Sequence, residues 1–291
     1  WHADWMLVPN HQDISFFART DFRNQRKVFG IRQADRLQHL YLVGKTGVGK
    51  STLLATLMRQ DLEAGRGFAL LDPHGELVQQ VRGMVPASRI SDVVYFNVPD
   101  NQAGLGFNPL EPVPAARRGL AASGLMDAFK KLWMDSWGPR LEHILRNAIY
   151  ALLEQPDATL GDILRLLDDP AFRRSVVARV TNVEVKRFWA EEFEKYPARL
   201  KTEAIAPLQN KVGAFLTDPI LHRILTMPKS RFRLRHMMDT GGVLLVNLSK
   251  GNLGEDNSAF LGSMLVTKFQ LDAMSRADIP EIGQSPFHPP P

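Results

Sequence analysis

Short apolar runs alternate with segments of helical periodicity along much of the chain. Three of these runs, residues 67–72, 92–97 and 241–248, contain few polar side chains. A continuous apolar run of this length predicts a strand buried on both faces, as in a parallel sheet. The apolar residues 39–43 predict a fourth strand. Strands alternating with helices predict an α/β fold with a mainly parallel sheet.

Helices are predicted just after residue 50, from about residue 76, and over about residues 256–277. Between about residues 114 and 227 the apolar positions recur every three or four residues, which predicts an all-helical segment. One stripe in that segment consists of Leu141, Ile144, Leu145, Ala148 and Leu152. We expect the aromatic side chains of this segment, such as Trp189, to lie in its core.

The change of pattern divides the chain. We expect residues 28–113 and 228–291 to form a single α/β core that is incomplete at its C-terminal end. Residues 114–227 are expected to form a helical insertion domain. Residues 1–27 give no clear periodicity, and their packing is not predicted.

Two basic segments allow two interpretations each. Residues 229–235 alternate charged and apolar side chains, which predicts a half-exposed strand with a basic outer face. This face is either an edge protected by charge or a surface that contacts phosphates. The six basic residues between Arg19 and Arg36 form either a solvated edge or a rim that faces nucleic acid or a neighbouring subunit.

Composition narrows the classes of function. The chain is 44% hydrophobic and 23% charged, as in ordinary soluble globular proteins. It contains no cysteine, which excludes disulfides and cysteine-based zinc sites. The net charge of +5 is compatible with binding to nucleic acid. No apolar run is long enough to span a bilayer as a helix, so we expect a cytoplasmic location, with any membrane anchor upstream of Trp1.

The strongest chemical signal is a glycine-rich run between the predicted strand at 39–43 and the helix after residue 50. It fits the phosphate-binding pattern G-x-x-x-x-G-K-[ST] at every fixed position. Glycines let the backbone N–H groups turn inward around a phosphate, and the helix directs its positive end at the same point. The expected nucleotide-binding residues are Gly44, Lys45, Thr46, Gly47, Val48, Gly49, Lys50, Ser51 and Thr52.

Within this loop, two side chains have distinct expected roles. Lys50 is expected to contact the β- and γ-phosphates, and the Ser51 hydroxyl to bind Mg²⁺. The predicted ligands are therefore ATP and Mg²⁺.

A second polar cluster follows the strand at 67–72, where it ends in Asp72-Pro73-His74-Gly75-Glu76. The carboxyl ends of parallel strands carry the sites of α/β proteins. Asp72 is expected either to face the nucleotide or to be a Walker B metal ligand, although Pro73 stands where a Walker B glutamate usually follows. His74 is either a turn histidine or a sensor of the γ-phosphate. Asp72 and Glu76 join Lys50 as candidate catalytic residues.

With these pieces in place, several runs resemble the HerA-like and TraG/TraD-like ATPases, which include type IV secretion and conjugation coupling proteins. They are VFGI at 28–31 followed by Asp35, Arg36 and His39, GKTGVGKST at 44–52, LDPHGE at 71–76, GFNPL at 106–110, WGPRLEHILRNA at 137–148 and LVNLSKG at 245–251. The glycine loop is common to many families. The runs around Asp72 and Arg140 are much more specific.

The resemblance implies a RecA-like motor core with an all-helical insertion, acting as a hexameric ring. Such rings pump DNA with ATP, some relatives export proteins, and type IV secretion components are possible partners. In this family the Walker B strand follows the helix that ends here near residue 278, so we expect its carboxylates beyond Pro291. The 291 residues alone are therefore expected to bind Mg·ATP weakly and to hydrolyse it poorly.

Four functions compete at this point. The first is an ATP-driven DNA translocase or conjugative coupling ATPase, and the second is a protein-secretion ATPase of the same architecture. The third is a nucleotide-gated scaffold without turnover. The fourth, a metabolic P-loop kinase, is disfavoured because a helical insertion of this length does not resemble a kinase lid.

Overall fold

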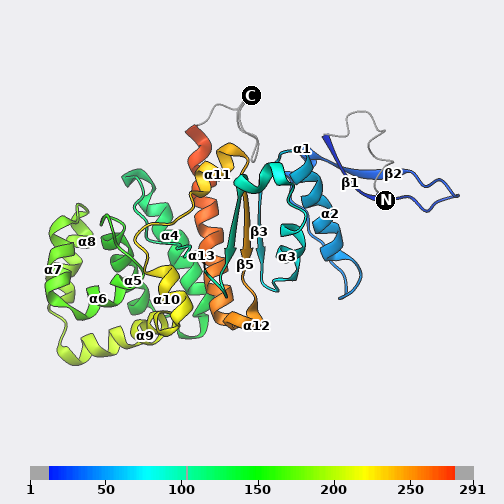
Figure 1. Ribbon diagram of the computed structural model, residues 1–291. Helices are drawn as coiled ribbons and strands as arrows, with labels where there is room; N and C mark the ends of the chain where they lie inside the picture. The colour runs from blue at the N-terminus through cyan, green and yellow to red at the C-terminus, as the bar shows by residue number, and fades with distance from the viewer. Residues whose placement is uncertain (1–12, 103, 279–291) are drawn as a thin grey trace.

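The computed structural model describes residues 13–102 and 104–278. At its centre lies a three-stranded parallel sheet formed by β3 (Phe68–Asp72), β4 (Val93–Asn97) and β5 (Val243–Asn247) (Figure 1). The spatial order is β3-β5-β4, so the last strand of the chain lies between the two earlier ones. Every residue of β5 is buried because both of its edges and both of its faces are covered. The three strands predicted from apolar runs are thus confirmed.

Helices cover both faces of this sheet. On one face α2 (Lys50–Glu63) and α3 (Glu76–Arg82) pack against alternate strand residues, and on the other face α4 (Arg118–Leu132) and α13 (Glu255–Met274) do the same. The alternation is clearest in β5, where Val243 and Leu245 face α2 and α3, whereas Leu244 and Val246 face the other layer. Side chains of successive strand residues point to opposite faces, so one buried strand serves two cores.

Between β4 and β5 the regular elements of the described chain are all helices. The elements after α4 are α5 (Pro139–Leu152), α6 (Asp162–Asp168), α7 (Pro170–Arg179), α8 (Val183–Arg187), a π-helical segment (Phe188–Phe193), α9 (Ala198–Thr217) and α10 (Pro219–Leu225). Trp189 is buried among them, as expected of a core aromatic residue. Helices α5 to α9 gather on the side of the sheet away from α2 (Figure 1).

These helices share a core with the sheet. The ring of Phe260 on α13 lies 5.7 Å from that of Phe129 on α4 and stacks at 4.0 Å on that of Phe215 on α9. The apolar contacts therefore continue from the sheet layer into the helical segment. The division of the chain into a core and an insertion domain stays a prediction.

The N-terminal part of the described chain forms an antiparallel hairpin of β1 (Ile14–Arg19) and β2 (Val28–Arg32), followed by α1 (Gln33–Arg36). Its tip contains Arg23 and Asn24 with φ of 51° and 57°, the left-handed conformation of a type I′ turn, which matches the twist of a hairpin. The hairpin lies beside α2 and forms its own two-stranded sheet (Figure 1). Residues 1–12 of the segment left unpredicted lie outside the described residues.

The strand predicted at residues 39–43 was wrong for the described chain. This segment is irregular, and the side chains of Tyr41 and Val43 are 90% and 79% exposed. A strand needs a neighbour to pair with its N–H and C=O groups, and none of the described strands lies against this segment.

The strand predicted at residues 229–235 was also wrong. The chain turns there and enters α11 (Leu234–Thr240), which leads into β5. Phe232 is buried, with its ring stacked at 6.4 Å on that of Phe107 and 5.7 Å from that of Phe96. Its alternation with exposed arginines comes from a turn anchored by one aromatic side chain, and not from a pleated strand.

After β5 a short helix, α12 (Lys250–Leu253), joins the sheet to α13. Short 3₁₀ segments occur at Ala87–Asp92, Ala115–Arg117, Met134–Ser136 and Ser275–Asp278. No helix in the described ranges has the length and apolar character needed to cross a membrane.

Candidate functional site

The glycine-rich loop, residues 44–49, is exposed and leads directly into α2. Gly47 and Gly49 have φ of 85° and 91°, the left-handed region in which a side chain would be strained. Gly49 is the N-cap of α2, and no side chain caps the helix. The first N–H groups of α2 are thus left available, at the positive end of the helix, for an anionic ligand.

The side chain of Lys50 folds back onto the start of this loop. Its Nζ donates hydrogen bonds to the carbonyl oxygens of Gly44 and Lys45, each at 2.7 Å. The ammonium group is therefore held over the loop by the residues that begin it. Ser51 and Thr52, which follow on the first turn of α2, are exposed.

Asp72 fixes the turn that follows β3. Its side chain is buried, with one carboxylate oxygen accepting from the His74 N–H at 2.9 Å and the other accepting from the Val78 N–H at 3.0 Å. The carboxylate therefore organises residues 73–75 and the start of α3. His74 and Glu76 are exposed, and Glu76 lies in the first turn of α3, where the helix dipole favours a negative charge.

Gly75 explains the tightness of this turn. Its φ is 88°, and a Cβ at this position would lie 2.8 Å from Oδ1 of Asn247 on β5. The Asp72–Glu76 run, one of the two specific signatures in the sequence, is thus a compact turn packed on the end of the central strand.

A row of polar residues ends the three strands of the sheet. Asp72, Asn247 and Asn97 are register partners across β3, β5 and β4. The Asn247 side chain donates from Nδ2 to Oδ1 of Asn97 at 2.8 Å and accepts at Oδ1 from the Ser249 N–H at 3.0 Å. The sequence analysis singled out Asp72 at this edge but missed Asn97, although Asn97 also ends a predicted strand and thus carried the same signal.

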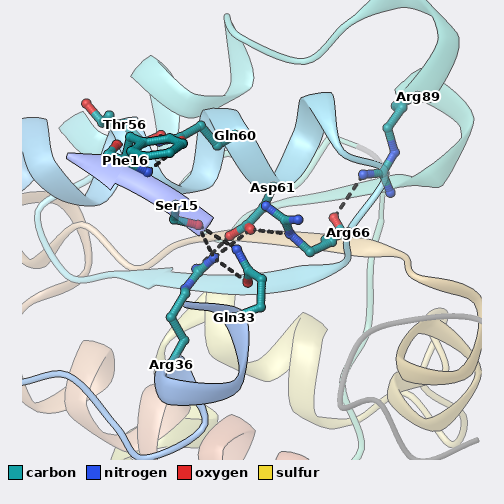
Figure 2. Close-up of polar contacts among 9 residues, drawn as sticks. All are labelled: Ser15, Phe16, Gln33, Arg36, Thr56, Gln60, Asp61, Arg66 and Arg89. Carbon is teal, nitrogen blue, oxygen red and sulfur yellow. Dashed lines mark hydrogen bonds and ion pairs between the residues drawn. The ribbon is translucent and has the colours of Figure 1, made fainter. Parts of the chain in front are cut away.

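A polar network at the other end of α2 fixes the hairpin to the helix (Figure 2). Arg36 forms a bidentate ion pair with Asp61, both contacts at 2.7 Å, and Asp61 also accepts from Nε of Arg66 at 2.8 Å. The Gln60 side chain donates to the Phe16 carbonyl at 2.8 Å and accepts from the Phe16 N–H at 2.9 Å. Arg36, one of the six basic residues expected to form either a solvated edge or a rim, therefore has a structural partner.

The residues of the glycine loop fit a nucleoside triphosphate with its bound metal ion. It combines open backbone N–H groups, a lysine and a serine hydroxyl at the start of one helix. Within residues 13–102 and 104–278 no group of three histidine or acidic side chains could hold a metal ion by itself.

The fold and the loop together define a RecA-like P-loop NTPase architecture. The sequence profile of the family described as "Helicase HerA, central domain" matches residues 33–265. The chain belongs to this family, as the resemblance in its sequence predicted.

A solved structure agrees with the fold. Plasmid coupling protein TrwB in complex with the non-hydrolysable GTP analogue GDPNP is 18% identical, with a TM-score of 0.51 over 87% of this chain and 55% of that chain. TrwB in complex with ADP and Mg²⁺ is also 18% identical, with a TM-score of 0.48 over 87% of this chain and 56% of that chain. The chain thus spans about half the length of these structures. Among curated proteins, none matches the sequence of the chain.

Proposed function

We propose that this chain is the ATP-binding motor domain of a ring-forming DNA translocase of the conjugative coupling type. The observation that carries the proposal is the uncapped start of α2, with Lys50 held over a glycine loop, in a chain of the HerA family. Membership of that family favours a motor over a metabolic kinase.

In this proposal, the residues from Gly44 to Thr52 hold the triphosphate. Lys50 directs its ammonium group at the β- and γ-phosphates, and the Ser51 hydroxyl would be a ligand of Mg²⁺. When bound, Mg²⁺ neutralises charge that develops on the phosphates. Several charge-assisted hydrogen bonds, each contributing about 1.5–3 kcal/mol, support useful affinity.

The proposed roles of the two carboxylates differ. Both carboxylate oxygens of Asp72 accept hydrogen bonds from backbone N–H groups. Its proposed role is therefore to stabilise the turn that positions Glu76. Glu76 is exposed at the start of α3 and orients the attacking water. Phosphoryl transfer to water depends mainly on such positioning and on charge stabilisation.

We also propose how the chain assembles and where it is located. The chain forms a ring, taken to be a hexamer, with DNA as the transported polymer and type IV secretion components as partners in the cytoplasm. Residues 28–113 and 228–291 form the motor core, and residues 114–227 form the insertion. A protein-secretion ATPase of the same architecture and a nucleotide-gated scaffold without turnover are the alternatives.

ATP hydrolysis by the full-length protein, measured with and without DNA over a range of salt concentrations, tests the proposal. We expect DNA to stimulate turnover and salt to remove the stimulation, because phosphate contacts release counterions. Turnover that is indifferent to DNA favours the secretion ATPase. Nucleotide binding without turnover favours the scaffold.

A further inference from the structure

The hairpin tip, residues 21–27 between β1 and β2, is basic, aromatic and exposed. All of its side chains are exposed, and its three cations, Arg23, Arg26 and Lys27, stand against a single aspartate. The side chain of Phe22 is 68% exposed. The tip points away from the sheet and its helices (Figure 1). A partner can therefore reach the cations and the aromatic ring together.

The three cations of the hairpin tip differ from other arginines of this chain. Arg36 faces Asp61 at 2.7 Å, and Arg173 faces Glu194 at the same distance. In the part of the chain that the structure describes, no carboxylate forms an ion pair with a cation of the tip. Their charge is thus not neutralised by neighbouring side chains, and it attracts a polyanion.

Phe22 places a flat apolar surface among these charges. The guanidinium of Arg23 lies over the ring, 5.0 Å from its centroid, and the ring is still largely open to solvent. An aromatic ring on which a base stacks, next to cations that follow the backbone, is the combination that holds single-stranded nucleic acid. This combination favours nucleic acid over an acidic peptide, which would match the cations alone.

Hydrogen bonds hold the hairpin tip in one conformation. The Thr20 hydroxyl accepts from the Lys27 N–H at 3.0 Å and donates to the Gln25 carbonyl. The Thr20 N–H donates to the Lys27 carbonyl at 2.9 Å, and the Gln25 N–H donates to the Phe22 carbonyl at 3.0 Å. Because the tip is already ordered, binding costs little conformational entropy in its backbone.

The base of the hairpin is attached to α2, the helix that begins at the glycine loop (Figure 2). The Gln60 side chain bonds to both backbone groups of Phe16, and Asp61 holds Arg36. A force on the tip therefore acts on the same helix whose first residue is Lys50.

We propose that the hairpin tip contacts an unpaired strand of DNA, with the Phe22 ring stacked on a base and the three cations of the tip against phosphates. This inference deepens the proposed function, on which it rests, because it names the element that touches the transported polymer. It also gives the contact a direct mechanical connection to the nucleotide site through α2.

Binding of a fluorescently labelled, unpaired DNA oligonucleotide to the full-length protein, measured by anisotropy over a range of salt concentrations, tests the proposal. Arg23→Gln/Arg26→Gln/Lys27→Gln should weaken binding about 10- to 100-fold. It should also reduce the slope of log affinity against log salt by about 2, since each phosphate contact on a single strand contributes about 0.7. Phe22→Ala should weaken binding about 5- to 150-fold with an unchanged salt slope, because the stacking ring carries no charge.

Matched controls separate these effects from loss of charge or of folding. Arg174→Gln/Arg179→Gln/Lys186→Gln removes the same three charges from exposed positions of α7 and α8, and it should keep the wild-type affinity and salt slope. Phe22→Trp retains an aromatic surface and should bind DNA as the wild type does. ATP affinity without DNA should be unchanged in every variant, which shows that each one is folded.

The outcomes distinguish this inference from the proposed function. If the variant of the three tip cations and Phe22→Ala both bind the oligonucleotide like the wild type, the DNA contact lies elsewhere and this inference is wrong, whereas DNA-stimulated turnover would still support the proposed function. An equal loss in the α7–α8 control, or no loss in Phe22→Ala, also overturns it.

Two further results contradict it in other ways. If the wild-type protein neither binds the oligonucleotide nor hydrolyses ATP faster in its presence, the proposed function fails and this inference fails with it. If the tip variants keep their DNA affinity but lose self-association in analytical ultracentrifugation, the hairpin tip contacts a second copy of this chain instead.

Discussion

The guanidinium of Arg36 and the carboxylate of Asp61 form a bidentate ion pair that joins the N-terminal hairpin segment to the last turns of α2. Asp61 is also bonded by Arg66, whose carbonyl accepts from Nη1 of Arg89 at 2.9 Å. Nη2 of Arg89 in turn reaches the carbonyl of Gly241, just before β5. One chain of polar contacts thus connects the hairpin, α2 and the central strand at the end of the sheet away from the glycine loop.

This arrangement predicts an asymmetry between the two partners. Asp61→Asn leaves two arginines without their shared carboxylate, and we expect it to lower the free energy of unfolding by about 3–5 kcal/mol. Arg36→Gln leaves Asp61 still paired with Arg66, so a smaller loss of about 1.5–3 kcal/mol is expected. Urea denaturation measures both. Equal losses would show that Arg66 does not support the carboxylate.

Lys50→Ala should abolish measurable ATP binding and turnover in the full-length protein, because it removes the ammonium group that is held over the glycine loop. Titration calorimetry with ATP and Mg²⁺ checks the binding. Lys186→Ala, at an exposed lysine of α8, is the matched control. If Lys50→Ala retains activity, the glycine loop has no part in the mechanism.

Asp72→Asn and Glu76→Gln should affect different properties. An amide in place of the Asp72 carboxylate directs a donor at a backbone N–H, which should lower the free energy of unfolding by about 1–3 kcal/mol. Glu76→Gln changes an exposed side chain, so stability should change by less than about 1 kcal/mol. Turnover should fall about 100-fold in Glu76→Gln, the size of effect expected when a group that orients the attacking water is lost.

Denaturation and ATPase assays on the same preparations separate these two properties. Glu184→Gln, at an exposed glutamate of α8, controls for loss of one negative charge. A turnover rate in Glu76→Gln equal to that of this control would remove Glu76 from the mechanism.

Tyr196 provides a test at alkaline pH. Burial, followed by the hydrogen bond that its hydroxyl donates to Glu192 at 2.8 Å, raises the pKa of Tyr196 from 10.0 to about 12. The neutral phenol is thus favoured in the folded state, so its contribution to stability is complete below pH 10.0 and is lost as the pH rises through about 12.

Tyrosinate absorbance during an alkaline titration measures this pKa, and Tyr196→Phe should remove the late step. Glu192→Gln should lower the pKa of Tyr196 towards its ordinary value. An unchanged titration in Tyr196→Phe would assign the late step to another tyrosine.

The central sheet was predictable because its strands are buried on both faces. Runs such as 241–248 contain almost only apolar residues. When helices follow such runs, the pattern is typical of a parallel sheet covered on both faces. The glycine loop was predictable for a different reason. Its glycines, lysine and serine stand at the fixed positions of a motif that binds phosphates and their metal ion. The position of α2 after the loop follows from the same motif.

The errors come from features that depend on distant partners. Residues 39–43 have strand-forming side chains, but a strand requires a pairing edge that a local pattern does not reveal. Phe232 and Leu234 are both buried, yet two apolar residues in alternation fit a turn entering α11 as well as they fit a strand. The attachment of the hairpin through Gln60 and Asp61 also escaped prediction, because polar residues on a helix usually face solvent.

The contacts of Lys50 have a consequence for exchange of ligand. The ammonium group has three N–H donors, and the carbonyls of Gly44 and Lys45 already accept from two of them. In the proposed nucleotide site, phosphate oxygens that take more than one hydrogen bond from Lys50 would displace a carbonyl, so the affinity would be a difference between two sets of bonds. The same carbonyls recapture the ammonium when the ligand departs. If the proposed function holds, the loop contains its own competitor for the ammonium group, and this competition would weaken the retention of spent nucleotide.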